Sequence, residues 1–170
     1  QHKSRKGLDI NKYGIMPSFK AKREKKPNVA FFIDTSGSIT EEELIIFINM
    51  LLNSPLDKWN VSAYQFDWDV YEIPKSIIKE GKLGKTAIRH GGCTSFENVV
   101  SFVNKMDKQP DKIIIITDGL GGSISSPIGD TDLWTWIINA SNYYSLQAYL
   151  DLKLTFKNVF KLDEVLKEMK

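Results

Sequence analysis

Five oxygen-bearing side chains form the pattern in this sequence that is most able to do chemistry. Asp34, Ser36 and Ser38 alternate along one short segment, so an extended or turning backbone points all three side chains the same way. Thr94 and Asp118 follow later, where a predicted helix begins and a predicted strand ends. Two carboxylates and three hydroxyls suit Mg²⁺, Mn²⁺ or Ca²⁺ and do not suit zinc or copper. The pattern predicts a divalent-cation site in which these five residues are the metal ligands.

This ligand set leaves the coordination shell of a cation incomplete. Two acids and three neutral hydroxyls underfill an octahedral ion, so waters and one anionic oxygen from outside the chain can also bind. An Asp or Glu of a protein partner can supply that oxygen. Two predicted helix N-termini direct positive partial charge at the site, which the acidic run Glu41, Glu42 and Glu43 offsets. We therefore expect the chain alone to bind metal with modest affinity.

Three predicted strands position these side chains. Residues 29–33 and 112–117 are short apolar runs typical of buried strands, and residues 61–66 form a further strand. Ligands of parallel α/β sheets gather beyond the carboxyl ends of the strands, so acids at those ends are expected to meet at one edge of the sheet. The acids that follow the three strands are Asp34, Asp67 and Asp118.

Two helices are predicted between these strands. Thr40 and Glu43 have the spacing of a capping box, which opens a helix over residues 41–53. Thr94 and Glu97 repeat that spacing at the start of a second helix. An apolar stripe with the period of a surface helix follows, formed by Phe96, Val99, Val100, Val103 and Met106.

The other elements are shorter. The connection over residues 67–69 is so tight that the strand it leads into, residues 70–73, must run antiparallel to its predecessor. The further predictions are a loop with one short element over 74–90, a loop over 121–130, a strand over 133–138, an edge strand over 149–154 and a helix from Asp163.

The order of these elements predicts the fold class. Strands that alternate with helices favour an α/β three-layer sandwich, with a mostly parallel central sheet and one antiparallel edge strand. Residues 1–28 are a basic N-terminal extension with a net charge of +7, and residues 29–170 are the folded domain, whose motif-bearing part is 29–139. We expect a solvated extension and contact with nucleic acid only through it.

Three motifs together resemble the von Willebrand factor type A (VWA), integrin I-like domain with its metal-ion-dependent adhesion site. They are Asp34-Thr-Ser-Gly-Ser38 after a strand, Gly-Gly-x-Thr94, and Thr-Asp118-Gly after a second strand. The resemblance implies a Rossmann-like sandwich and a protein-interaction role. It also implies that the three hydroxyls contact the metal directly, while Asp34 and Asp118 act largely through waters.

The short chain is similar to one group of such domains. Its length and its residues 91–96 and 133–136 look like the compact prokaryotic and phage members, which are often paired with a MoxR-type AAA+ ATPase. The resemblance implies such an ATPase as partner. In that group an Asp commonly follows the threonine, whereas this chain has Ser95 there, which removes an acid near the site.

Residues beside the predicted metal site are expected to form a partner-binding rim, namely Asp67, Trp68, Ser95 and Gly119. Asp67 also has the position of a residue that closes a turn. Trp68 is either a satellite core residue or an exposed aromatic anchor of the kind that dominates interfaces. Trp134 and Trp136 share one strand face and are expected in the core. Cys93 is expected to be buried and to have no part in chemistry.

Composition excludes several classes of protein. One cysteine in 170 residues rules out an internal disulfide framework and a multi-cysteine zinc site. No apolar run approaches the ~20 residues that span a membrane, and no cleavable signal pattern is present. We expect a cytoplasmic protein that has no membrane contact.

Three functions are compatible with the pattern. The first is a metal-dependent protein-interaction module that is not an enzyme. The second is a metal-assisted hydrolase, in which the cation acts as Lewis acid and His90 is the nearby base. The third is a structural or virion assembly component that uses the fold as a scaffold and docks through its basic extension. The shortage of a base or nucleophile beyond the ligands themselves favours the first.

Overall fold

The computed structural model describes residues 8–11, 14–17, 25–80 and 91–168, which contain two separate sheets. The first is an antiparallel pair in the basic extension, β1 (Leu8–Asn11) and β2 (Gly14–Pro17). The second sheet and its helices comprise β3 (Asn28–Asp34), α1 (Glu41–Leu52), β4 (Asn60–Phe66), β5 (Val70–Ile73), α2 (Lys75–Glu80), α3 (Phe96–Asn104), β6 (Lys112–Thr117), the 3₁₀ turn η2 (Thr131–Leu133), β7 (Trp134–Ile138), α4 (Tyr143–Thr155), β8 (Asn158–Lys161) and α5 (Leu162–Glu168). No helix in the described ranges is long and apolar enough to cross a membrane.

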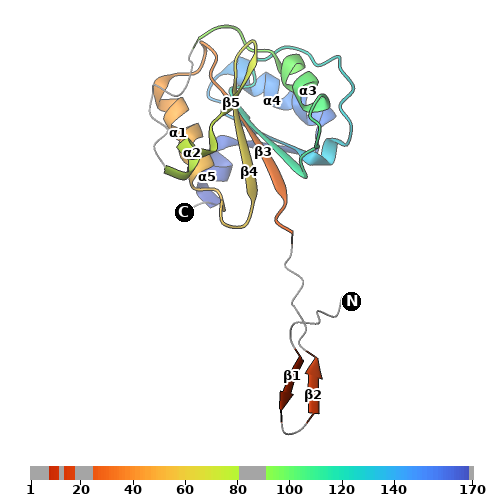
Figure 1. Cartoon of the computed structure of the whole chain (residues 1–170). Coiled ribbons are helices and arrows are strands. Elements are labelled where there is room, and N and C mark those ends of the chain that lie inside the picture. The colour runs from red at the N-terminus through yellow and green to blue at the C-terminus, as the bar shows by residue number, and fades with distance from the viewer. Residues whose placement is uncertain (1–7, 12–13, 18–24, 81–90, 169–170) are drawn as a thin grey trace.

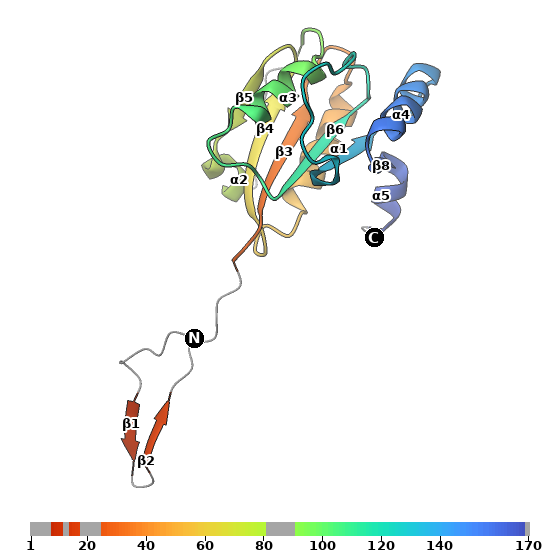
Figure 2. The ribbon, with the colours of Figure 1, turned by 90° about the vertical axis from the view of Figure 1, so that its right-hand side faces the viewer.

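The larger sheet has six strands in the order β5-β4-β3-β6-β7-β8. β5 runs antiparallel to β4, and every other neighbouring pair is parallel. Helices α1, α2 and α5 cover one face, and α3 and α4 cover the other (Figures 1 and 2). The prediction of a Rossmann-like α/β three-layer sandwich with one antiparallel edge strand is confirmed.

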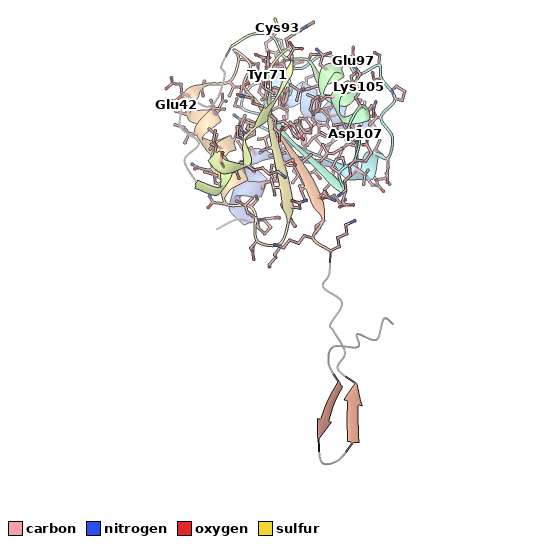
Figure 3. All side chains as sticks on the ribbon, viewed as in Figure 1. Glu42, Tyr71, Cys93, Glu97, Lys105 and Asp107 are labelled. Atoms are coloured by element: carbon pink, nitrogen blue, oxygen red, sulfur yellow. The ribbon has the colours of Figure 1, made fainter. Side chains whose placement is uncertain are left out.

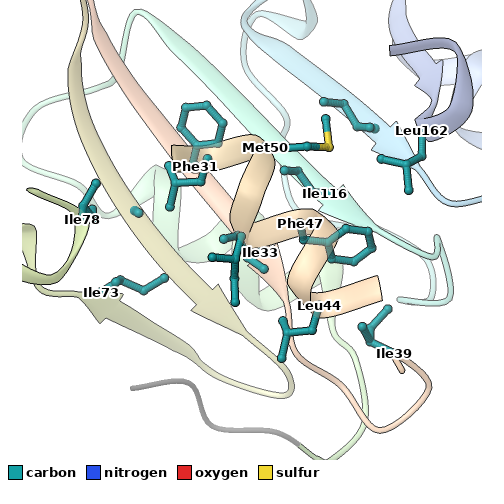
Figure 4. Packing of buried hydrophobic residues seen from close by; sticks show 14 of the residues in the cluster. Phe31, Ile33, Ile39, Leu44, Phe47, Met50, Ile73, Ile78, Ile116 and Leu162 are labelled. Carbon is teal, nitrogen blue, oxygen red and sulfur yellow. The ribbon is translucent and has the colours of Figure 1, made fainter. Parts of the chain in front are cut away.

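Packing on the first face joins β3 to α1. Phe31 and Ile33 of this strand lie against α1, whose Leu44 and Phe47 point into the same cluster (Figure 4). Burial of each such side chain contributes roughly 1.5–3 kcal/mol. Because β3 and α1 are both anchored in this cluster, the loop between them, which starts at Thr35, is held at its two ends.

The second face has an aromatic core. The ring centroid of Trp136 lies 4.9 Å from that of Phe96 at the start of α3 and 5.1 Å from that of Phe156 after α4. Trp134 stacks beside Trp136, at 6.4 Å. Both tryptophans are buried, as predicted from their shared strand face. This core joins α3 and α4 to β7.

The prediction of an edge strand over residues 149–154 is wrong, because these residues belong to α4. Asn142 is the N-cap of this helix, and its side chain accepts a hydrogen bond from the N–H of Ser145 at 3.0 Å. β7 and β8 are parallel neighbours, and parallel neighbours need a crossover, which α4 supplies. The edge strand is β8 instead. In the segment 74–90, α2 is the short element, and residues 81–90 lie outside the described ranges.

The two predicted capping boxes have different outcomes. Thr40 and Glu43 form theirs, with both reciprocal hydrogen bonds present. The box expected from Thr94 and Glu97 does not form: Ser95 is the N-cap of α3, and its hydroxyl accepts from the backbone N–H three residues later. The Glu97 carboxylate instead accepts hydrogen bonds from residues 125 and 126, so a tertiary contact takes the place of the local one.

Candidate metal centre

The carboxyl ends of three neighbouring strands bring the candidate residues to one edge of the sheet. Asp34 is the last residue of β3 and pairs in register with Phe66 of β4. On the other side, Ile33 pairs with Ile116 of β6, so Thr117 lies beside Asp34. The acids that follow β4 and β6 in the sequence therefore flank the end of β3, as the strand pattern predicts.

Asp34 is a buried carboxylate with a fixed set of donors. Its Oδ1 accepts from the N–H of Ser36 at 2.9 Å, and its Oδ2 accepts from the hydroxyl of Thr117 at 2.5 Å. Thr117 Oγ in turn accepts from the N–H of Gly119 at 3.0 Å. Burial raises the pKa of Asp34 to about 6, although the hydrogen bonds from Thr117 and Ser36 lower it, and the charge of Asp118 raises it further. The anionic form is costly here unless a cation is near.

The two serines of the motif lie side by side. The Oγ atoms of Ser36 and Ser38 are 3.2 Å apart, with Ser36 buried and Ser38 exposed. The N–H of Ile39 donates to the carbonyl of Ser36, which turns the chain toward the start of α1. The pair of hydroxyls therefore runs from the buried carboxylate of Asp34 to the surface.

Thr94 is placed by backbone hydrogen bonds on both of its sides. Before it, the N–H of Gly37 donates to the carbonyl of Gly92 at 3.0 Å. After it, the N–H of Ser95 donates to the carbonyl of Asp67, also at 3.0 Å. Gly92 has φ +96°, a conformation that favours glycine. Thr94 is thus held, half-buried, on a segment tied to the ends of both β3 and β4.

Asp118 follows β6 and is buried, with 5% of its surface exposed. Its Oδ1 accepts from the N–H of Leu120 at 2.9 Å. The chain turns at Gly119, where φ is +89° and a Cβ would lie 2.9 Å from the Cβ of Ala148 in α4. Within the described part of the chain, neither Asp118 nor Asp34 forms an ion pair with a basic side chain.

The four residues expected at the rim differ in exposure. Trp68 is 60% exposed, which resolves the choice left open for it, and its carbonyl accepts from Asn98 Nδ2 at 2.5 Å. Asp67 closes the turn, because its Oδ1 accepts from the N–H two residues on at 3.0 Å. Ser95 and Gly119 are both buried, so neither offers a side chain to a partner on the surface.

Cys93 was expected to be buried, and this is wrong: the thiol is exposed (Figure 3). The reason is its position in the connection that passes over the carboxyl edge of the sheet, between the anchored residues Gly92 and Ser95. His90, the candidate base of the hydrolase alternative, lies outside the described ranges.

Thr117 and Asn139 also lie at the candidate site, although the sequence pattern does not point to them. Thr117 orients Asp34, and the signal for it is a lone hydroxyl at the end of the apolar run of β6. Asn139 follows β7, and its Nδ2 donates to Glu43 Oε1 of α1 at 2.5 Å. Its N–H also donates to the carbonyl of Thr117 at 2.9 Å. These contacts connect α1, β6 and β7 around the candidate ligands.

The donor set fits a hard cation. Two carboxylates and two adjacent hydroxyls share the sheet edge, and Thr94 is on a segment fixed to the same edge. In the described residues, three His, Cys, Asp or Glu side chains do not come together as a metal site. A cation here would therefore need the hydroxyls as well as the acids, and such oxygen ligands are those of Mg²⁺, Mn²⁺ or Ca²⁺.

Comparisons with known proteins identify the family. One solved structure that resembles the chain is an aerotolerance-related membrane protein from Bacteroides fragilis, at 14% identity and a TM-score of 0.43, with 66% of each chain covered. Among curated proteins, none matches. A family model described as a VWA-like domain (DUF2201) matches residues 29–144, which is more than half of the chain. The chain therefore belongs to the family of VWA-like domains.

Proposed function

We propose that this VWA-like domain is a metal-dependent protein-interaction module. Asp34, Ser36, Ser38, Thr94 and Asp118 would hold one Mg²⁺, Mn²⁺ or Ca²⁺ ion, and an Asp or Glu of a partner protein would complete its shell. The observation that carries the proposal is the carboxylate of Asp34, which is buried at the sheet edge with no basic side chain paired to it in the described residues. A buried carboxylate without a countercharge is costly, and a bound cation offsets that cost.

The residues have different parts in this proposal. Thr117 and the backbone N–H of Ser36 fix the orientation of Asp34. Ser36 and Ser38 present two hydroxyls that lead from the buried end of the site to solvent. Because this set is short of negative charge, metal and partner carboxylate would bind cooperatively, each raising the affinity for the other.

The partner and the compartment belong to the same proposal. A MoxR-type AAA+ ATPase is the partner that the family resemblance implies. Trp68 is exposed on the rim, and tryptophan is a residue type found at interface hot spots. A reducing compartment such as the cytoplasm would keep the exposed thiol of Cys93 reduced. The proposed role is binding, and no catalytic step is assigned to the domain.

The first test measures the binding of Mn²⁺ to the full chain. The electron paramagnetic resonance signal of the free ion is the readout. Asp34→Asn and Ser36→Ala are expected to lose binding at least tenfold. Asp107→Asn and Ser76→Ala are matched controls on exposed residues away from the candidate ligands, and they should bind as the wild type does. Unchanged binding in both site variants would refute the metal site.

The second test asks whether the metal is used to hold a protein. The tagged chain is mixed with cell extract with and without EDTA, and captured proteins are identified by mass spectrometry. An AAA+ ATPase that is captured with Mg²⁺, and lost with EDTA or with Asp34→Asn, supports the proposal. Capture that is indifferent to EDTA and to both site variants contradicts it. Hydrolase activity that requires both Mg²⁺ and His90 would replace it with the enzymatic alternative.

A further inference from the structure

A groove of about 600 Å³ lies between α4 and the segment of residues 120–128. Its walls are mostly apolar and come from three parts of the chain: Phe96 at the start of α3, Ile124 and Ile128 of the segment, and Leu152 and Phe156 at the end of α4. The candidate metal ligands are not among the lining residues. Gly119, expected at the rim of the metal centre, also lines the groove, so the groove adjoins the proposed metal centre but shares none of its ligands.

The topology explains why a groove exists at this place. The parallel neighbours β3 and β4 are connected through α1, and β7 and β8 are connected through α4. The connection between β6 and β7 contains only the short turn η2, and it runs between α3 and α4 (Figure 2). A helix is thus missing on this face at the position where one would pack between two others.

The segment that forms one wall is firmly attached to α3. The carboxylate of Glu97 accepts from the backbone N–H groups of Ser125 and Ser126, at 2.7 and 3.1 Å, and from both of their hydroxyls. At the other end, the N–H of Phe96 donates to the carbonyl of Gly121 at 3.0 Å, and a Cβ at Gly121 would overlap the Phe96 ring. The wall is held at two points, so the groove is built into the fold.

Large apolar side chains at the mouth of the groove are open to solvent. Tyr143 is 74% exposed, Tyr144 72% and Leu120 40%. Exposed apolar clusters of this kind mark interaction sites, and tyrosine is enriched at interface hot spots. The two tyrosine rings contact each other, with centroids 5.8 Å apart.

The groove contains one negatively charged side chain. Asp151 on α4 is the only charged residue that lines it, and it is exposed. Its Oδ1 accepts from Gln147 Nε2 at 2.9 Å, and the described residues provide no basic side chain for it. An occupant complementary to this surface is apolar over most of its length and carries a Lys or Arg opposite Asp151.

We propose that this groove binds an amphipathic helix of a protein partner. The helix would lie between α4 and the segment of residues 120–128, with its apolar side chains against Ile124, Ile128 and Leu152 and a basic side chain at Asp151. A mostly apolar groove with α4 as one wall is a setting in which helix-in-groove recognition uses anchors at positions i, i+3, i+4 and i+7. The inference goes beyond the proposed metal-dependent function, because binding in this groove needs no cation.

The test selects peptides against the full chain in EDTA, from a displayed library of helix-forming peptides of about 15 residues. Enriched sequences are expected to have apolar residues at helical spacing and one Lys or Arg. Affinities of an enriched peptide are then measured by fluorescence anisotropy. Tyr144→Ala and Asp151→Lys should each weaken binding at least tenfold, and a Lys-to-Glu change in the peptide should restore binding to Asp151→Lys.

Leu154→Ala is the matched control, because Leu154 is 87% exposed on the same helix and does not line the groove. It should bind as the wild type does. The proposal is overturned if no peptide is enriched, or if enriched peptides bind all three variants alike. It is also overturned if sedimentation shows self-association that Tyr144→Ala abolishes, because a second copy of the chain would then be the occupant.

Discussion

The hydroxyl of Thr117 lies 2.5 Å from Oδ2 of Asp34, although the two residues are 83 positions apart in the sequence. The contact joins the ends of the adjacent strands β6 and β3, and Gly119 donates to the same hydroxyl from the following turn. Thr117 therefore links the orientation of one candidate ligand to the backbone that carries the other, Asp118.

Thr117→Val is expected to destabilise the metal-free domain by about 1.5–3 kcal/mol at pH 7.5, because it removes a hydrogen bond to a buried charged group. The loss should be smaller at pH 5, where Asp34 is largely protonated and the missing bond no longer serves an anion. Urea unfolding at the two pH values measures both effects.

Thr35→Val is the control for this experiment. Thr35 is also buried, and its hydroxyl donates to the neutral carbonyl of Phe66 at 3.1 Å. Its substitution should cost about 1 kcal/mol with no difference between the two pH values. Equal pH dependence in the two valine variants would show that Thr117 does not act through the charge of Asp34.

The local sequence pattern correctly predicted the elements for which the apolar pattern and the capping residues indicate the same structure. The apolar run before Asp34 identified β3, and Thr40 with Glu43 identified the start of α1. The same capping pattern failed at Thr94, because Glu97 bonds to residues 125 and 126, which are distant in sequence. Such competition between a local and a tertiary hydrogen bond is invisible without the fold.

Only part of the candidate site could be predicted from the sequence. Asp34, Asp67 and Asp118 each follow a predicted strand. Because the carboxyl ends of parallel strands meet at one edge of a sheet, this pattern predicts that the three acids lie at that edge. The exposure of Cys93 and the burial of Gly119 depend on how the connecting segments pass over that edge. Those paths are set by contacts such as that between Gly119 and Ala148, which no sequence period encodes.

Ionisation of Asp34 should destabilise the metal-free domain as the pH rises from about 4 to about 6. Burial raises the pKa of Asp34 to about 6 in the folded state, whereas the unfolded chain has the ordinary value near 4, so within this window the folded state binds more protons. The contribution of Asp34 to stability is therefore highest below the window and falls through it. Asp34→Asn should remove this dependence and stabilise the metal-free domain at pH 7.5 by at most about 3 kcal/mol.

Chemical unfolding in EDTA across pH 4–8 measures this effect, with Asp107→Asn as the exposed control. Excess Mg²⁺ should restore the stability of the wild type at pH 7.5 and leave Asp34→Asn unchanged. A wild-type domain whose stability in EDTA rises relative to that of Asp34→Asn through the same window, or an Asp34→Asn variant that Mg²⁺ stabilises equally, would contradict the prediction.

Glu97→Gln should loosen the segment of residues 120–128. The hydrogen bonds from Ser126 and Ser125 lower the pKa of Glu97 to about 2 from an ordinary 4.5. The hydrogen bonds between Glu97 and the two serines therefore contribute stability above pH 4.5, and that contribution is lost as the pH falls toward 2.

Amide hydrogen exchange at pH 7 should show lower protection of Ser125 and Ser126 in Glu97→Gln than in the wild type. Glu72→Gln, on an exposed residue of β5, should leave this protection as it is in the wild type. Unchanged protection in Glu97→Gln would show that other contacts hold the segment.

Gly119→Ala tests whether the turn after Asp118 is set by its contact with α4. Two costs should add: the positive φ of +89°, and the overlap of a Cβ 2.9 Å from that of Ala148. Gly122 separates them, since it also has a positive φ, of +75°, but no atom within 4 Å of a Cβ. Gly122→Ala is expected to cost about 1–2 kcal/mol, and Gly119→Ala about 1–3 kcal/mol more.

The double variant Gly119→Ala with Ala148→Gly completes the comparison. This double variant should regain the stability lost to the overlap, because the Cβ of residue 148 is gone. It keeps the cost of the positive φ at residue 119, and the glycine within α4 adds a cost of about 1 kcal/mol. Urea unfolding of the four chains in EDTA measures these differences, and Mn²⁺ titration then asks whether the displaced turn weakens cation binding through Asp118. If Gly119→Ala costs no more than Gly122→Ala, α4 yields to the added methyl group, and the position of Asp118 does not depend on the contact with Ala148.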